Sequence, residues 1–176
     1  AHGTANPGKL TLSTSGGYAQ FCAELFHHMS GMKLVVVVYK GGFPALLDAM
    51  DGLARINRDP SIAKQFLAYQ AVIRGKENAG QERAMTTAAF AANKVEAAQY
   101  RAILQKRHKQ EAYQEVFSGA ADAGQKAALQ KVLGGSAEKE VQRLRAILDA
   151  GPAQGGFNVE PADWFKAISE KIDELH

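Results

Sequence analysis

The sequence FLAYQAVIRGKENAGQERAMTTAAF, residues 66–90, decides the fold of this chain, because it predicts one long helix with an unusual centre. Before the centre, apolar residues recur at spacings of four and three, the pattern of a helix that buries one face: Ile62, Phe66, Tyr69 and Ile73. The same stripe then passes through charged and small residues before Phe90: Lys76 or Glu77, Gly80, Arg83 and Thr87. A helix that only packs does not need charge on its buried stripe, so its centre indicates a further role.

Length and composition place the chain among globular proteins. Its 176 residues suffice for one domain, or a domain with an appendage, and 46% of them are hydrophobic. The net charge of +3 is small, and acids and bases alternate along helical segments, which favours solvated helix faces over a nucleic-acid-binding surface. The longest dense apolar run, LVVVV at 34–38, is too short to span a bilayer. We therefore expect no nucleic acid as a partner, and contact with a membrane only through flanking segments.

The first 44 residues predict a β-α-β segment. A short strand over 11–15 precedes a glycine turn and a helix over 18–29, and the valine-rich sequence 33–40 is typical of a strand buried on both faces. This order implies two parallel strands. Two strands alone do not form a stable sheet, so the segment needs further partners. The chain begins at Ala1 and not at a methionine, and we expect a mature form or a fragment.

From about residue 45 the sequence predicts helices rich in alanine, lysine, glutamate and glutamine. We place them at about 44–56, 60–94, 96–118, 122–133, 136–150 and 161–175. Proline and glycine mark the breaks, for example at Pro60 and at Gly134-Gly135. Because short loops join long helices, we expect a mainly α protein, an antiparallel helical bundle with the small β-α-β segment at its N-terminus.

Residues 66–90 resemble the signature helix of the nitrate- and nitrite-sensing (NIT) domains. That family has an aromatic residue, a short apolar stretch, Lys-Glu, a Gly and then Glu-Arg-Ala, and this chain has Lys76-Glu77, Gly80 and Glu82-Arg83-Ala84. Four further segments match the family in order: ARINRDPSIAKQ (54–65), EAYQEVF (111–117), VQRLRAIL (141–148) and ADWFKAISEKIDEL (162–175). The resemblance covers roughly residues 45–176.

This resemblance implies a function. NIT domains are all-helical sensory modules of bacterial receptors, chemoreceptors and antiterminators, and they bind nitrate or nitrite without transforming the anion. We therefore expect a non-catalytic module of a signal-transduction receptor, with a small inorganic anion as its ligand and no cofactor. By the same resemblance we expect the extracytoplasmic, periplasmic portion of a membrane receptor, with a cytoplasmic location as the alternative. A homodimer is compatible with that role.

Residues 5–50 resemble a different family. The segment has a strand, a Ser/Gly turn, a helix that ends in Glu24-Leu25-Phe26, a valine-rich strand and Tyr39-Lys40-Gly41-Gly42. In this it is similar to part of the Bug-type solute-binding receptors of tripartite tricarboxylate transporters, which close two α/β lobes around a carboxylate. We therefore expect two parts, residues 1–44 and 45–176. The alternative functions are a fragment of such a periplasmic carboxylate receptor, or a recombined product without ligand.

Arg83, Arg143 and Gly80 are the ligand-binding residues that we expect. Nitrate is planar, and a guanidinium is planar, always charged and able to offer paired donors to two oxygens. In the NIT family, arginines of the Glu-Arg motif and of the later Val-x-x-Leu-Arg helix are implicated in nitrate recognition; we match them to Arg83 and Arg143, with Arg145 as a nearby substitute for the latter. Gly80, one turn before Arg83, gives a ligand or a facing helix room to approach. The alternative role of Arg83 is a structural ion pair with Glu77 or with an acid on another helix.

Other polar groups indicate structure more than chemistry. His27 and His28 diverge by about 100° on a helix, so they cannot hold one metal ion as a facing pair. Cys22 fits a small buried thiol, and the basic sequence 106–109, KRHK, fits a solvated helix face. The turn at residues 13–17 precedes a helix and can offer backbone N–H groups to an anion, although no P-loop lysine follows it. We expect no catalytic residue and no metal site.

Overall fold

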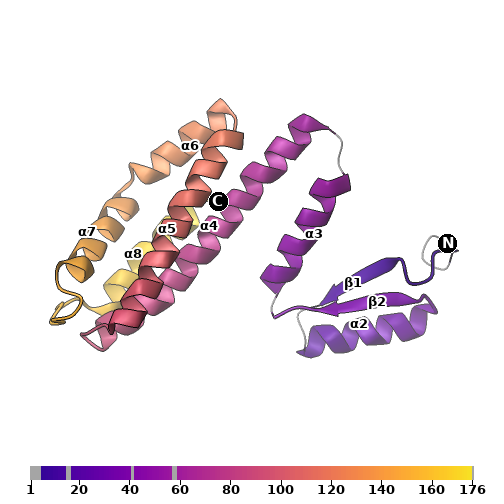
Figure 1. The fold of residues 1–176 in the computed structure, drawn as a ribbon, viewed down its shortest axis with the longest axis horizontal. Coiled ribbons are helices and arrows are strands. Elements are labelled where there is room, and N and C mark those ends of the chain that lie inside the picture. Colours follow the sequence, from indigo (N-terminus) through magenta and orange to yellow (C-terminus); the bar gives the residue numbers. More distant parts are fainter. Residues whose placement is uncertain (1–4, 15–16, 41, 57–58, 176) are drawn as a thin grey trace. The chain divides into compact units, whose positions relative to one another are not determined.

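The computed structural model describes residues 5–14, 17–40, 42–56 and 59–175. Its elements are, in order, β1 (Leu10–Thr14), α2 (Gly17–Ser30), β2 (Leu34–Val38), α3 (Gly42–Ile56), α4 (Pro60–Ala91), α5 (Ala97–Ala120), α6 (Ala123–Leu133), α7 (Ser136–Ala150) and α8 (Pro161–Glu174). The described part of the chain is therefore mainly helical with a small two-stranded sheet, as the sequence predicts (Figure 1). Contacts divide the chain between residues 58 and 59 into two compact units, and each has its own architecture.

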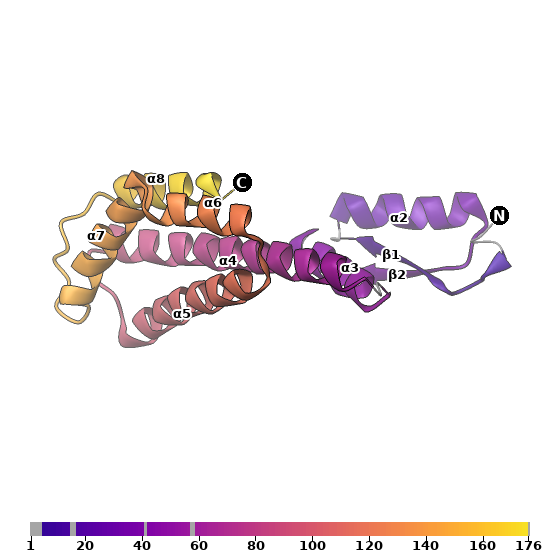
Figure 2. The same ribbon diagram turned by 90° about the horizontal axis from the view of Figure 1, so that it is seen from above.

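The first unit is a β-α-β segment followed by α3. Strands β1 and β2 pair in parallel, with Leu10 opposite Leu34 and Thr14 opposite Val38, which confirms the parallel strands predicted from the strand-helix-strand order. Tyr39 continues this pairing, since its N–H donates to the Thr14 carbonyl at 2.7 Å. Helix α2 packs against both strands, and α3 contacts β1 (Figures 1 and 2).

The thiol of Cys22 is exposed on α2, so the prediction of a buried thiol is wrong. Helix α2 turns the side that carries Ala23 inward, and Ala23 is buried. Cys22 lies about 100° away from Ala23 around the helix, on the outer side. Phe26 and Met29, which are also on α2, are 51% and 76% exposed.

Helix α4 is the long helix that the sequence predicts. Asp59 caps its start, because the carboxylate accepts a hydrogen bond from the Ser61 N–H, and Pro60 occupies a first-turn position that needs no N–H donor. The helix ends at Ala91, and Asn93 follows with a φ of +51°, a left-handed conformation that ends a right-handed helix. The intervening 32 residues contain no other proline and remain helical through the glycines at their centre.

The main core of the second unit lies between α4, α5, α7 and α8. Trp164 is fully buried there, and its indole N–H donates to the Arg83 carbonyl at 3.0 Å. Phe90 contacts the rings of Trp164 and Phe157 edge-on, with centroids 6.1 and 5.7 Å apart. Phe165 lies about 100° further round α8 and is 48% exposed. Trp164 therefore anchors α8 to α4, while the Phe165 ring stays partly exposed on another side of α8.

A second, smaller core lies beneath α6. Most of its buried members are alanines: Ala68, Ala71, Phe117, Ala121 and Leu129. Helix α6 begins with a capping box between Asp122 and Gln125 but buries only Leu129. This end of the second unit is therefore built mostly from small side chains and is covered by a short helix.

The connection between α7 and α8 is fixed to the end of α4. The Gly156 N–H donates to the Asn93 carbonyl at 3.0 Å. Gly155 has a φ of +67°, and a Cβ at this position would lie 2.5 Å from the same carbonyl oxygen. Gly156 has a φ of +73°, but a Cβ there would meet nothing within 4 Å. Both positions favour glycine by conformation, and Gly155 also requires the absence of a side chain.

We predict that Gly155→Ala lowers the free energy of unfolding more than Gly156→Ala does. Both variants place an alanine at positive φ, at a cost of about 1–2 kcal/mol. Only Gly155→Ala adds a clash with the backbone of Asn93, which forces the loop to move. Urea unfolding of the two variants measures the difference, and equal losses would contradict this packing.

Candidate functional site

Two adjacent residues of α4, Glu82 and Arg83, point to different parts of the second unit. Successive residues on a helix diverge by about 100°, so they cannot share one environment. Glu82 is 0% exposed and faces α5 and α7, whereas Arg83 is half-buried and faces α8. The centre of the long helix therefore carries a buried acid on one side and a partly exposed base on another.

Arg83 lies against α8 through two contacts. Its Nη1 donates to the Ser169 hydroxyl at 2.8 Å, and its Cζ lies 4.6 Å from the centroid of the Phe165 ring. Ser169 in turn donates to the Phe165 carbonyl at 2.6 Å, which fixes the hydroxyl for the arginine. The Phe165 ring thus lies against one face of the guanidinium, and the guanidinium Nε and Nη2 donate to no other described residue.

No carboxylate among the described residues lies within 4.0 Å of the Arg83 guanidinium. Glu77, the partner that we considered as an alternative, accepts a hydrogen bond from Gln81 at 2.7 Å instead. The partners of this half-buried cation, a hydroxyl and an aromatic ring, are neutral, so its charge has no counter-charge among the described residues. Within the described part of the chain, the structural ion pair considered for Arg83 is not found.

Gly80 precedes Arg83 by one helical turn on α4 and is half-buried. A Cβ at this position would meet nothing within 4 Å, so no described helix approaches it closely. The glycine therefore has no packing role of its own in the described residues, and it leaves open space next to Arg83.

Arg143 lies apart from Arg83, on the surface of α7. Its Nε and Nη2 donate to the two carboxylate oxygens of Glu140 at 2.8 and 2.7 Å, and its side chain is 57% exposed. The hydrogen bond from Arg143 lowers the pKa of Glu140. The described structure brings Arg83 and Gly80 together on α4, but it shows no contact between Arg143 and either of them.

The buried carboxylate of Glu82 is the centre of a polar network that sequence reasoning missed. It accepts hydrogen bonds from Arg145 Nε at 2.8 Å and Nη2 at 2.5 Å, from Arg107 Nε at 2.9 Å and from Gln110 Nε2 at 2.7 Å. Burial alone would raise the pKa of Glu82, but the hydrogen bonds and charge of Arg145, the Gln110 amide and the charge of Arg107 outweigh it. The pKa therefore lies below its ordinary value, and the buried group stays ionised.

Further charges surround this network. Arg107 Nη1 donates to both oxygens of Asp149 at 2.8 Å, and the Tyr100 hydroxyl donates to the same carboxylate at 3.0 Å. Lys171 Nζ lies 2.7 Å from a carboxylate oxygen of Glu138, and both side chains are nearly inaccessible. The second unit therefore holds two buried ion-pair groups inside its helical core.

The prediction of a solvated face for residues 106–109 is wrong for Arg107, which is 6% exposed. A signal was present in the sequence, since Arg107 follows the buried Ile103 by four residues. Arg145 also falls within a buried stripe, between Val141 and Leu148 on α7. An arginine that interrupts an apolar stripe indicates a buried ionic partner, here the glutamate of the Glu-Arg pair.

A family model described as nitrate and nitrite sensing (NIT) matches residues 36–176. The chain belongs to the NIT family. It is thus a sensing module of the nitrate and nitrite class found in signalling proteins. No curated protein and no solved structure matches the chain.

The NIT match begins at residue 36, earlier than the boundary near residue 45 that we expected. It takes in most of β2 and the first residues of α3, which we had assigned to residues 1–44. No comparison supports that resemblance for residues 5–50. Of the turn considered as an anion cradle, Ser15 and Gly16 lie outside the described residues.

The described part of this NIT chain has no group of three or more histidine, cysteine, aspartate or glutamate side chains that can hold a metal ion. Nor does any described helix combine the length and hydropathy needed to cross a membrane. The titratable groups that the structure gathers are the buried ion pairs around Glu82 and Lys171.

We predict that Glu82→Gln lowers the free energy of unfolding by about 3–5 kcal/mol, because it leaves the buried guanidinium of Arg145 without its counter-charge. Glu140→Gln, which removes the exposed partner of Arg143, is the matched control and should leave the unfolding midpoint unchanged. Urea unfolding measures both variants. A Glu82→Gln variant as stable as the control would refute a structural role for the network.

We further predict that the network makes the fold acid-sensitive. Because the pKa of Glu82 is lower in the folded chain than its ordinary value of 4.5, ionised Glu82 stabilises the fold above that value. This contribution is lost as the pH falls below 4.5 and through the folded-state pKa. The free energy of unfolding should therefore fall more steeply for the wild type than for Glu82→Gln between about pH 5 and pH 3. Parallel profiles would contradict the assignment.

Proposed function

We propose that this chain is the non-catalytic, extracytoplasmic sensing part of a bacterial signal-transduction receptor, and that it binds nitrate or nitrite at Arg83. Arg83 and Gly80 form the proposed contact region on α4. Arg143 is the proposed second cation, which reaches the anion only when its ion pair with Glu140 opens. We also propose that the helices of the second unit act as an antiparallel bundle.

The observation that carries this proposal is the Arg83 guanidinium, half-buried and without a carboxylate partner among the described residues. The other buried arginines, Arg107 and Arg145, already bind Glu82. A planar monoanion gains most from a guanidinium whose donors are not engaged by an acid. Nitrate and nitrite are such anions, and the family to which the chain belongs senses both.

The surroundings of Arg83 suit a weakly hydrated anion. Phe165 supports one face of the guanidinium, and Ser169 holds one of its N–H groups, so little side-chain freedom is lost when an anion binds. The open space at Gly80 leaves room for the anion one turn away on α4. Chloride has the same charge but is a single atom and cannot place two acceptors opposite two parallel N–H donors, so we expect it to bind more weakly.

The proposed output is mechanical. Trp164 and Ser169 tie α8 to the same turn of α4 that carries Arg83. An anion at Arg83 favours whichever packing of these two helices gives its oxygens more donors, and the equilibrium between packings shifts accordingly. A shift of α8 relative to α4 is then the signal.

Isothermal titration calorimetry tests the proposal. We expect the wild type to bind nitrate and nitrite, and Arg83→Gln to weaken both by at least tenfold, about 1.4 kcal/mol, since a charge-assisted contact is lost. Gly80→Leu should also weaken binding, because its side chain fills the open space, whereas Gly80→Ala should keep the fold and gain about 0.5–1 kcal/mol of helix stability.

Arg101→Gln, which changes an exposed arginine of α5, is the matched control and should bind as the wild type does. Nitrate binding that survives Arg83→Gln unchanged would overturn the site. A wild type that shows no heat with either anion would overturn the proposed function of this chain.

A further inference from the structure

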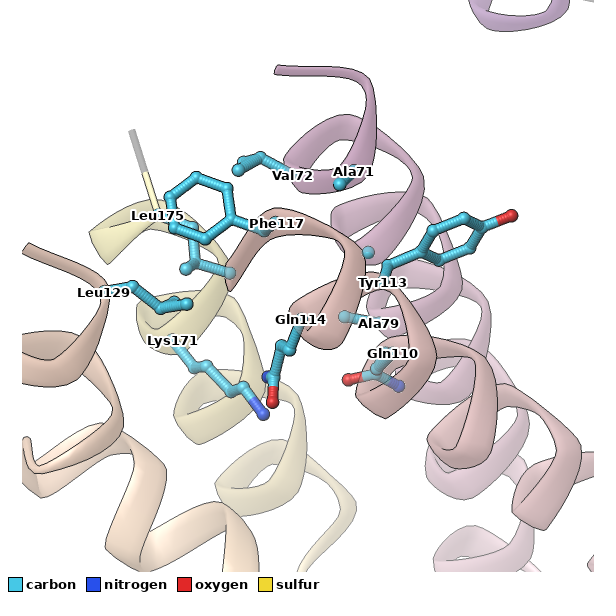
Figure 3. Close-up of a pocket in the computed structure, with 11 residues that line it drawn as sticks. Ala71, Val72, Ala79, Gln110, Tyr113, Gln114, Phe117, Leu129, Lys171 and Leu175 are labelled. Atoms are coloured by element: carbon cyan, nitrogen blue, oxygen red, sulfur yellow. The ribbon is translucent and has the colours of Figure 1, made fainter. Parts of the chain in front are cut away.

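A small cavity lies between α4, α5, α6 and α8, separate from the proposed anion site. Its volume is about 30 Å³, and its walls are mostly apolar (Figure 3). A larger recess of about 710 Å³ opens to solvent next to it, beneath α6. Four residues line both: Val72, Phe117, Leu129 and Leu175. The cavity and the recess are therefore two parts of one pocket with an entrance from solvent.

The pocket exists because the residues around it are small. On α4, Ala71, Gly75 and Ala79 face it at intervals of four residues. Helix α6 covers it but buries only Leu129, so a single side chain closes the apolar wall. With so few contacts, α6 can move away from the pocket at a lower cost than the other helices of the unit.

The inner end of the pocket is polar. Figure 3 shows the ends of the Lys171 and Gln114 side chains at one end of the cavity, and Phe117, Val72 and Leu175 at the other. Gln114 is half-buried, and within the described residues its amide has no hydrogen-bond partner. Lys171 uses its ammonium for Glu138 and, with three N–H groups, has donors to spare.

The donors at this end suit an anion. Lys171 and Gln114 both line the cavity, and each has N–H groups that no described residue engages. Burial and the charge of Arg145 lower the pKa of Lys171, whereas Glu138 and Glu82 raise it. A cavity of about 30 Å³ has room for the two oxygens of a carboxylate, since about 10–15 Å³ hold one water molecule.

We propose that this pocket binds a small amphipathic monocarboxylate, such as a medium-chain fatty acid, with the carboxylate at Lys171 and Gln114 and the hydrocarbon chain against Phe117, Leu129 and Leu175. Helix α6 is the lid over the chain. The site is distinct from Arg83 and does not depend on nitrate binding. Because Gln110 both lines the cavity and donates to Glu82, occupancy of this site bears directly on the buried network.

The test uses octanoate and octanol as probes, titrated into the full chain by calorimetry. We expect octanoate to bind at least tenfold more tightly than octanol, because only the carboxylate uses the Lys171 ammonium. Leu129→Trp fills the pocket and should abolish binding of both probes. Leu67→Trp, at an exposed leucine of α4, is its matched control and should bind as the wild type does.

The charge requirement is tested with the double variant Lys171→Met/Glu138→Gln, which removes the buried pair together so that neither charge is left alone. It should bind the two probes equally. Lys166→Met, at an exposed lysine of the same helix, should keep the preference for octanoate. Equal affinities of the wild type for octanoate and octanol would overturn the proposal, as would binding that persists in Leu129→Trp. None of the residues proposed for nitrate lines this pocket, so failure at one site is distinguishable from failure at the other.

Discussion

The second unit depends on one buried carboxylate, that of Glu82 on α4. A charge at 0% exposure is tolerable only with excellent partners, and it has them from two other helices, Arg107 on α5 and Arg145 on α7. These bonds fix the rotation of α4 about its axis. Once that rotation is fixed, Arg83 must face α8, because it lies about 100° further round the helix. The internal ion network and the outward-facing arginine are two consequences of the same constraint.

The helices and strands of this fold could be predicted from the sequence, but the buried polar contacts around Glu82 could not. Helices, strands and the parallel pairing follow from local patterns, and the structure confirms them within a few residues. The partners of Glu82 could not be predicted in that way, because an acid in a helix does not reveal which distant base faces it. Arg143 and Arg145 differ by only two residues, yet one is exposed against Glu140 and the other is buried against Glu82. The difference comes only from the rotation of α7 about its axis, which turns Arg145 toward the core and Arg143 toward solvent.

For the candidate site too, the sequence indicates which residues share a helix face but not which partners they have. Arg83 and Gly80 share a helical stripe that the sequence shows directly, and the structure leaves space beside them. What the sequence could not show was whether an acid on another helix faces Arg83, because a local pattern does not reveal contacts between distant segments. In the structure, Glu77 accepts a hydrogen bond from Gln81, and the Phe165 ring lies against one face of the Arg83 guanidinium. These partners leave the charge of Arg83 without an acid, and for this reason we propose an anion there. The small pocket beneath α6 could not be predicted from the sequence either, because its walls come from four helices.

The most direct measurement of the central claim is an NMR titration of the arginine side-chain Nε–Hε resonances with nitrate. Arg107 and Arg145 bind Glu82, whereas Arg83 has no carboxylate partner among the described residues. We predict that the Arg83 resonance, assigned by its absence in Arg83→Lys, shifts saturably while those of Arg107 and Arg145 stay in place. Saturable shifts at Arg107 or Arg145 with a stationary Arg83 would contradict an anion site at Arg83.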